Sequence, residues 1–219
     1  MENDYNEEDL ETLFKKLVDT EEIESILIDG EDNKIIPDAK IDNPLVLCGS
    51  FNPLHEGHMK LLDAAYKKFP TRTPCFQLCV INCDKGPINF ETFAKRSSQF
   101  IKQGKKLLVS KSPLFIHMAK IWPSCMFLLG YDTFTRLLLL KYYDNSEEKL
   151  QEALQGFRDY NSQFLVAGRY DCDQDKFLTP DFEQEVEQED YRDMFFELTE
   201  EEFRVDLSST ELRGQGKTL

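Results

Sequence analysis

The sequence predicts an α/β protein built on a parallel sheet of about five strands, with helices on both faces. Short apolar runs alternate with amphipathic segments along most of the chain, which is typical of strands joined by crossover helices. The strand segments are apolar at nearly every position, as expected where both faces of a sheet are covered. A chain of 219 residues is long enough for one such domain with a sizeable core.

The expected elements follow one another from residue 43 onward. Five segments are expected to be parallel strands: 44–49, 75–81, 106–110, 125–130 and 163–168. Apolar residues at three- and four-residue spacing predict helices between them, over about 58–68, 90–104, 112–122, 131–143 and 146–157. Nearer the C-terminus we expect an exposed acidic helix over 181–193, a short strand over 194–198 and a last helix from residue 208.

Residues 1–42 differ from the rest, and we expect an acidic N-terminal extension followed by one domain over 43–219. Helical spacing predicts a helix over 7–18, and two apolar runs flanking turn residues predict a hairpin over 25–36. The acidic start does not resemble a secretory leader, and no apolar run reaches the roughly 18 residues of a membrane span. We therefore expect a cytoplasmic protein, with the nucleus as the alternative, and no membrane partner.

Charge is distributed unevenly along the chain. The formal net charge of −15 argues against nucleic acid or an anionic membrane as the main partner. Residues 51–120, however, carry 12 lysines and arginines against 4 acidic residues. This positive middle could hold a small anionic ligand, or it could consist of solvated helix faces. The acidic ends are candidates for protein contacts.

The six cysteines are expected to be free thiols, since no secretory signal accompanies them. Cys75, Cys79 and Cys83 follow one another at four-residue spacing on or just after a predicted strand. Four extended residues span about 13 Å, which is too far for neighbouring thiols to share one metal ion. We therefore predict no metal site here and assign these cysteines to packing.

The sequence GSFNPLHEGH, residues 49–58, follows the first predicted parallel strand. Ligands bind at the carboxyl ends of the strands in parallel sheets. Gly49 permits a tight turn and the close approach of a ligand. The backbone amides of Ser50 and Phe51, together with the helix N-terminus, can hold phosphate oxygens.

The same sequence carries two of the three histidines of the chain, His55 and His58. At a spacing of three residues they are expected on one helix face, where imidazoles can donate hydrogen bonds to phosphate oxygens. Gly57 inside a helix costs about 1 kcal/mol relative to alanine, which is reasonable if a flat or bulky group packs there. The alternatives are two histidines that cap a helix by chance, or a zinc pair for which no third ligand is evident.

A second hydroxyl-rich sequence, LSSTELR over residues 207–213, lies near the C-terminus. Ser208, Ser209 and Thr210 would begin a helix and offer an anion site. Arg213, one turn further, could reach the same phosphates with a bidentate fork. Taken alone, the sequence could also be an ordinary helix cap.

These two sequences resemble the signatures of the HxGH nucleotidyltransferase superfamily. GSFNPLHEGH is most similar to the nicotinamide and nicotinate mononucleotide adenylyltransferase branch, and LSSTELR resembles the superfamily's ISSTxIR-like motif. The resemblance covers about residues 44–214. It implies a Rossmann-like nucleotidyltransferase fold of the adenine nucleotide alpha hydrolase-like type, with His55, His58 and Arg213 as catalytic residues.

Three weaker matches lie between these motifs. LLGYDTFTRL resembles the family's GxDTF, which implies that Gly130 and Asp132 approach the nucleotide ribose. The family segment after the second parallel strand implies that Lys85 contacts the phosphate of the acceptor, and Arg96 lies on the following helix. FLVAGR implies a place for Arg169 near the base. Asp132 could instead be a helix cap, and Lys85 a surface lysine.

One segment departs from the adenylyltransferase pattern. After the third parallel strand the family usually carries a Trp-Glu pair, whereas this chain reads SKSPLF at residues 110–115. The one tryptophan, Trp122, is expected to pack in the core. The departure leaves the identity of the acceptor open.

The resemblance implies adenylyl transfer from ATP to a phosphate acceptor with release of pyrophosphate. Nicotinamide or nicotinate mononucleotide is the favoured acceptor, which would place the protein in NAD biosynthesis. Mg²⁺ would be carried mainly by the phosphates. Two alternatives remain open: cytidylyl transfer or ATP hydrolysis on the same site, and a non-catalytic nucleotide-binding protein whose acidic ends, 1–42 and 171–202, contact partners.

Overall fold

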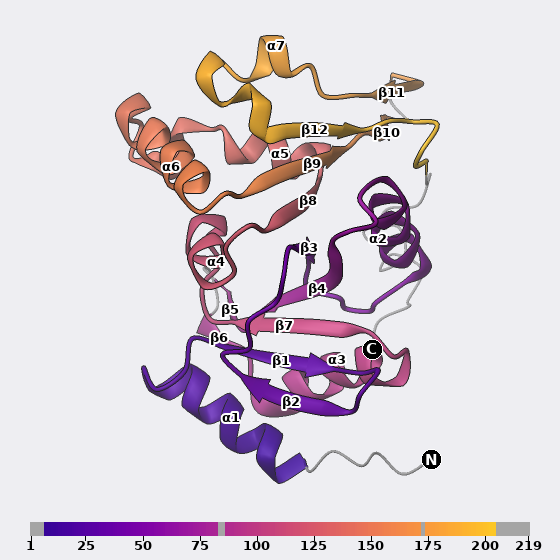
Figure 1. Cartoon of the computed structure of the whole chain (residues 1–219), viewed down its shortest axis with the longest axis vertical. Coiled ribbons are helices and arrows are strands. Elements are labelled where there is room, and N and C mark those ends of the chain that lie inside the picture. Colours follow the sequence, from indigo (N-terminus) through magenta and orange to yellow (C-terminus); the bar gives the residue numbers. More distant parts are fainter. Residues whose placement is uncertain (1–6, 83–85, 172–173, 205–219) are drawn as a thin grey trace.

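The central sheet has eight strands in the order β12-β9-β8-β3-β4-β7-β1-β2, in a computed structural model that describes residues 7–82, 86–171 and 174–204 (Figure 1). The six strands from β12 to β7 are parallel, and β1 and β2 are antiparallel to their neighbours. The strands are β1 Ser25–Asp29, β2 Lys34–Pro37, β3 Pro44–Cys48, β4 Thr73–Cys79, β7 Lys106–Ser110, β8 Met126–Gly130, β9 Gln163–Ala167 and β12 Phe195–Leu198. The predicted α/β class is confirmed, with the short strand expected over 194–198 as a sixth parallel strand.

The parallel strands follow the Rossmann order. The chain runs outward from β3 through β4 to β7, then returns to the other side of β3 as β8 and continues to β9 and β12. The direction of winding therefore reverses between β3 and β8. In open α/β sheets the ligand crevice lies at such a switch point, outside the carboxyl ends of the strands.

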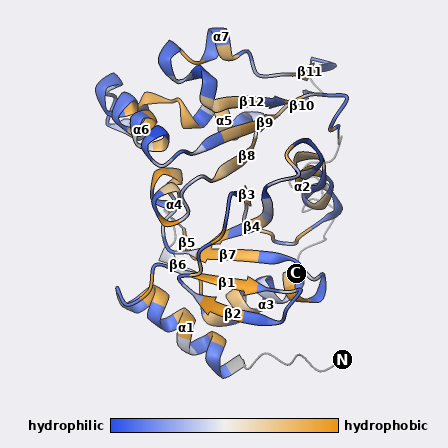
Figure 2. Cartoon of the chain, viewed as in Figure 1, coloured by the Kyte–Doolittle hydropathy of each residue, from blue (hydrophilic) through white to orange (hydrophobic). Residues whose placement is uncertain are grey.

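Helices cover both faces of the sheet. The face with α1 (Glu7–Asp19), α2 (Glu56–Lys68) and α3 (Phe90–Lys102) has one apolar core, and the face with α4 (Phe115–Ile121), α5 (Tyr131–Leu137) and α6 (Glu147–Asp159) has the other. Most strands of the central sheet are coloured mainly hydrophobic, while the helices carry both hydrophobic and hydrophilic residues (Figure 2). The remaining elements are short: β5 Ile81–Asn82, β6 Gly86–Pro87, η1 Leu140–Tyr143, β10 Arg169–Asp171, β11 Lys176–Leu178, α7 Phe182–Glu185 and η2 Glu189–Met194.

The described part of the N-terminal extension joins this sheet. The predicted helix and hairpin are present as α1 and β1–β2, and β1 pairs antiparallel with β7. All five residues of β1 are buried, and the Phe14 ring of α1 stacks on Phe93 of α3 at 4.8 Å. Residues 7–42 thus share the core of the sheet, while the domain boundary at residue 43 stays a prediction.

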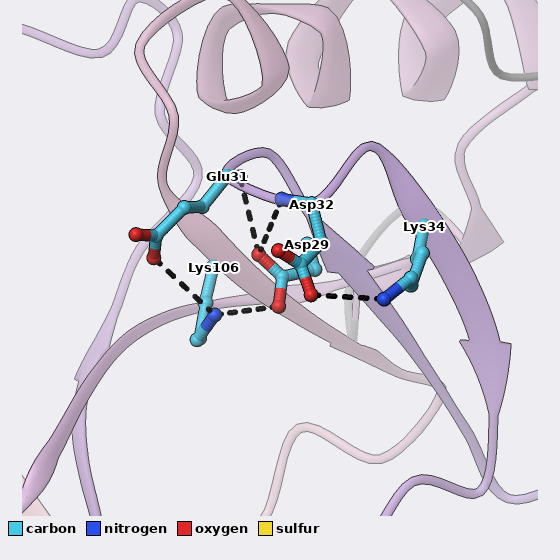
Figure 3. A network of polar contacts seen from close by, with 5 residues as sticks. All are labelled: Asp29, Glu31, Asp32, Lys34 and Lys106. Carbon is cyan, nitrogen blue, oxygen red and sulfur yellow. Dashed lines mark hydrogen bonds and ion pairs between the residues drawn. The ribbon is translucent and has the colours of Figure 1, made fainter.

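A network of charges fixes the turn between β1 and β2 (Figure 3). The Asp29 carboxylate accepts hydrogen bonds from the amides of Glu31 and Asp32, and it pairs with Lys106 of β7 at 2.5 Å. Burial alone would raise the pKa of Asp29. The Lys106 ammonium and the two amides outweigh burial and hold that pKa below its usual value.

The helix predicted over 131–143 is interrupted. α5 ends at Leu137, Leu139 is extended, and a separate turn of 3₁₀ helix, η1, follows. The Tyr143 hydroxyl donates to the Leu137 carbonyl at 2.7 Å. A side chain therefore satisfies a carbonyl group at the end of α5 that a longer helix would have bonded through its backbone.

The acidic helix predicted over 181–193 is wrong as a single helix. The segment forms α7 and η2, with Val186 fully buried between them. The Arg192 guanidinium donates to the carbonyls of Glu183 and Val186 and pairs with the Glu183 carboxylate at 2.9 Å. A single helix here would place many acidic residues close together, where they would repel one another. Burial of Val186 and the hydrogen bonds from Arg192 to the two carbonyls stabilise the broken conformation instead.

The predictions about packing residues hold where the structure tests them. Trp122 is buried in the core beneath α4, as expected. Cys75 and Cys125 are buried free thiols, and burial raises the pKa of Cys75 to about 12. Such groups pack as small apolar side chains and stay protonated.

Candidate functional site

The loop after β3 is shaped by an aromatic side chain that turns inward. Phe51 has a positive φ of 45°, and its ring is 1% exposed, in edge contact with Phe76 and Phe100. A Cβ atom on Gly49 would lie 2.8 Å from that ring. The close approach that Gly49 permits is therefore that of the Phe51 ring, not only of a ligand.

The backbone of this loop is available to a ligand. The Gly49 amide donates to the Gln77 carbonyl of β4 at 3.1 Å. Among the residues that the structure describes, no carbonyl accepts a hydrogen bond from the amides of Ser50 and Phe51. These two amides can donate to an anion, as predicted for this loop.

Gln99 of α3 holds the loop in place. Its side-chain amide donates to the Phe51 carbonyl at 3.1 Å, and its side-chain oxygen accepts from the Leu54 amide at 2.8 Å. Sequence analysis missed this residue, because a polar position on the flank of an amphipathic helix carries no signal of what it faces. Gln99 is the link between α3 and the start of α2.

The two histidines meet at the N-terminus of α2. His55 is the N-cap residue with an extended backbone, and its amide donates to Nδ1 of His58 at 3.3 Å. Their rings stack at 3.6 Å between centroids, and the His58 ring also contacts the edge of Phe51 at 5.1 Å. Because Nδ1 of His58 accepts, the neutral ring carries its proton on Nε2 and can donate from there.

Both imidazoles are neutral at neutral pH. Burial, with a smaller contribution from the nearby His55, lowers the pKa of His58 to about 4. Burial also lowers the pKa of His55. The pair therefore offers hydrogen-bond donors without adding positive charge until an anion binds and favours protonation. Gly57, at the second position of α2, lies between these rings in the sequence.

Gly130 and Asp132 lie at the carboxyl end of β8, beside the switch point. Gly130 is the N-cap of α5, with open space around its Cα, so Asp132 is not the helix cap that the sequence left as an alternative. The Asp132 carboxylate pairs with Nε of Arg169, just after β9, at 2.9 Å, and both side chains are substantially exposed. The structure thus brings together two residues assigned to the nucleotide from separate motifs.

Five of the predicted site residues lie outside the described residues: Lys85, Ser208, Ser209, Thr210 and Arg213. Their roles stay predictions. Within residues 7–82, 86–171 and 174–204, no cluster of three histidine, cysteine or acidic side chains could hold a metal ion.

A cavity of about 420 Å³ lies on the other face of the sheet, among α4, α5, η1 and α6. Its lining is mainly apolar and aromatic, with one cationic side chain, and includes Leu114, Ile116, Arg136, Leu137, Tyr142 and Tyr143. Leu114 is 51% exposed and Tyr142 is 58% exposed, so the cavity is open to solvent. Because its lining starts just after β7 and β8, it reaches the carboxyl side of the sheet.

The Rossmann strand order, with two histidines at the start of the helix that follows the first parallel strand, defines a nucleotide-binding α/β protein of the HxGH nucleotidyltransferase type. A family model described as cytidylyltransferase-like matches residues 46–215, and the chain belongs to this family. No curated protein matches the chain. Membership of the family supports nucleotidyl transfer as the general activity. No helix in the described part of the chain is long and apolar enough to cross a membrane.

Proposed function

We propose that the protein transfers the adenylyl group of ATP to the phosphate of nicotinamide or nicotinate mononucleotide and releases pyrophosphate. The observation that carries this proposal is the stacked pair of neutral imidazoles at the N-terminus of α2, beside the switch point. The similarity of GSFNPLHEGH to the mononucleotide adenylyltransferase branch favours ATP and this class of acceptor.

The reaction needs positioning and charge stabilisation more than proton transfer. An oxygen of the acceptor phosphate bonds to the α-phosphorus of ATP while the bond to the bridging oxygen breaks, and pyrophosphate leaves with that electron pair. Nε2 of His58 donates to a non-bridging α-phosphate oxygen, where negative charge grows in the transition state, and His55 acts beside it. Neither an enzyme-bound intermediate nor an external base is required.

The remaining proposed contacts are supported by the geometry for the described residues and by the family resemblance for the others. The amides of Ser50 and Phe51 face the phosphates, and Asp132, oriented by Arg169, accepts from the ribose hydroxyls. The other proposed contacts are Lys85 with the acceptor phosphate, Arg169 with the base, and Ser208, Ser209, Thr210 and Arg213 with the β- and γ-phosphates. The described residues offer no ligand cluster for Mg²⁺, so we expect it to be held mainly by the phosphates of ATP.

The cavity among α4, α5 and α6 supports a ring-bearing acceptor. Leu114 of its lining belongs to the segment SKSPLF, where the family usually carries a Trp-Glu pair, and Tyr142 and Tyr143 add aromatic rings. Arg136 donates only to the Asp132 carbonyl and the Thr133 hydroxyl, so its charge has no carboxylate partner among the described residues. An apolar wall with a cation suits a flat heterocycle on a charged sugar phosphate.

The first experiment is pyrophosphate release from MgATP with and without each mononucleotide, with the products identified by mass. We expect release that depends on the mononucleotide, together with a dinucleotide product. Tight ATP binding without acceptor-dependent release would overturn the proposed acceptor. If binding to cellular partners is lost on removal of residues 1–42 while ATP affinity is unchanged, a non-catalytic role is favoured instead.

A second candidate is cytidylyl transfer to an alcohol phosphate, which the cytidylyltransferase-like family favours. ATP and CTP can be compared by thermal shift, because a ligand that binds only the folded state raises the melting temperature. A larger shift with CTP than with ATP at equal concentration would select this candidate.

A further inference from the structure

The arginines of the protein divide into two kinds. Within the described residues, Arg96 is the one arginine whose side chain makes neither a hydrogen bond nor an ion pair with the protein. The other described arginines are all engaged by carboxylates, carbonyls, a hydroxyl or a side-chain amide: Arg72, Arg136, Arg158, Arg169, Arg192 and Arg204.

Arg96 is also partly withdrawn from water. It is half-buried on α3, and burial lowers the pKa of its guanidinium with no opposing contribution from a nearby anion. A guanidinium that loses hydration without gaining a partner costs stability. Such a cost is expected where a binding site is prepared for a ligand that supplies the missing anion.

The position of Arg96 relates it to the histidine loop. It precedes Gln99 by three residues, so both lie on neighbouring positions of the same flank of α3, and Gln99 contacts the loop directly. α3 begins beyond the carboxyl end of β4 and runs back along the sheet. Arg96 therefore lies one turn closer than Gln99 to the N-terminus of α3, the end of the helix that lies at the carboxyl edge of the sheet, as the histidines do.

We propose that Arg96 is a phosphate-binding residue of this site, the fixed cation that complements the uncharged histidine pair. The inference rests on the proposed function for the identity of the phosphate, which belongs either to ATP or to the acceptor. In the ligand-free protein the two imidazoles supply donors but no charge, whereas a phosphate chain carries several negative charges. Arginine suits this task because its planar fork binds two phosphate oxygens at once and keeps its charge.

The test compares the full-length wild type with Arg96→Ala, Arg96→Lys and Lys95→Ala. Lys95 is the matched control, since it is an exposed cation on the same turn of α3. Calorimetric titrations with MgATP, pyrophosphate and nicotinamide mononucleotide give the affinities. We expect Arg96→Ala to bind at least one of the three about 10- to 100-fold more weakly, and Lys95→Ala to stay within about 2-fold of wild type.

The ligand affected identifies the phosphate. Loss of MgATP and pyrophosphate binding assigns Arg96 to the triphosphate, and loss of mononucleotide binding alone assigns it to the acceptor. We also expect the ligand-free melting temperature of Arg96→Ala to be no lower than that of Lys95→Ala. If Arg96→Ala does not fold, the Arg96→Lys variant tests the role of Arg96. It keeps the positive charge but loses the planar guanidinium, so it should bind the affected ligand several-fold more weakly than wild type.

Unchanged affinity of the Arg96 variants for all three ligands would overturn the inference, as would a wild type that binds none of them. A wild type that binds MgATP but forms no dinucleotide would refute the proposed acceptor. In that case the difference between Arg96→Ala and Lys95→Ala would still decide the role of Arg96.

Discussion

Two polar regions at the edges of the same sheet differ in whether their polar groups have partners within the protein. At the turn between β1 and β2, the Asp29 carboxylate is satisfied within the protein by Lys106 and by the amides of Glu31 and Asp32 (Figure 3). At the histidine loop, the Ser50 and Phe51 amides have no protein acceptor among the described residues, and neither has the guanidinium of Arg96, which we propose for the same site. The first region is closed because its charges are paired within the protein. The second region is open, with donors that under the proposed function bind an anion.

The largest expected effect is on catalysis at the open region. His58→Ala removes a donor to the α-phosphate, and we expect kcat to fall by about 10²- to 10³-fold, as when one oxyanion donor is lost. The thermal stability of this variant should fall only modestly, because the ring contacts and the hydrogen bond from the His55 amide are lost but no ion pair is broken. Steady-state kinetics and a melting curve measure the two quantities.

His117→Ala is the control for this variant. His117 is an exposed histidine on α4 that bonds to Ser112 and belongs to neither region. Turnover of His58→Ala within a few-fold of wild type would show that the open region is not the transfer site.

The closed region should respond in the opposite sense. Asp29→Ala leaves two amides without their acceptor and the partly buried Lys106 ammonium with only the Glu31 carboxylate at 3.9 Å. We expect a loss of about 1–3 kcal/mol in the free energy of unfolding. The turnover number of the folded enzyme should not change. Urea unfolding and activity assays measure these effects.

Asp32→Ala serves as the matched control, because its ion pair with Lys34 is well exposed. Such a pair contributes only about 0–1 kcal/mol. An equal loss in the two variants would mean that burial of the Asp29 pair adds nothing to stability.

Gln99 combines features of both regions. Its side-chain amide is hydrogen-bonded within the protein, as in the closed region, and those bonds hold the open loop in place. Gln99→Ala removes two hydrogen bonds, and we expect a loss of about 1–2 kcal/mol in stability together with a fall of about 10-fold in kcat. Ser98→Ala is the control, because its hydroxyl bonds only to the Lys95 carbonyl within α3. A stability loss with unchanged kcat would exclude a positioning role.

The smallest expected effect is a difference in pH dependence. The folded-state pKa of His58, about 4, is below the unfolded value near 6.5. The unfolded chain therefore binds more protons between these values, and stability is lost as pH falls through that window. We expect a decrease on the order of 1 kcal/mol between pH 6.5 and 5, which His58→Phe should reduce.

Asp29 should show its own effect only in stronger acid. Its pKa is also lowered, but its contribution is fully present above the unfolded pKa of about 4 and is lost only as pH falls through the folded value. Urea unfolding of Asp29→Asn and His58→Phe from pH 7 to 3 separates the two windows. Identical pH profiles for both variants would contradict the assignment of separate titrating groups.

Much of the fold could be predicted because its signals are local. The apolar runs predict β3, β4, β7, β8 and β9, and the amphipathic periods predict α2, α3 and α6, close to where the structure has them. The helix predictions over 131–143 and 181–193 failed at points where the competing contact comes from another segment. Tyr143 satisfies the end of α5, and Arg192 captures carbonyls next to buried Val186.

The features of the site also divide into those with a local signal in the sequence and those that depend on tertiary contacts. The sequence by itself determined the histidine pair, the glycine-led loop and their place after a strand, because those residues are contiguous and their chemistry is intrinsic. Only the tertiary structure decided that β1 would extend the sheet beside β7, that Gln99 would hold the loop and that Arg96 would find no acceptor in the described part of the chain. Those outcomes depend on contacts between segments that are far apart in the sequence. Hydrogen bonding, burial and charge compensation arise from such contacts and cannot be read from any single segment.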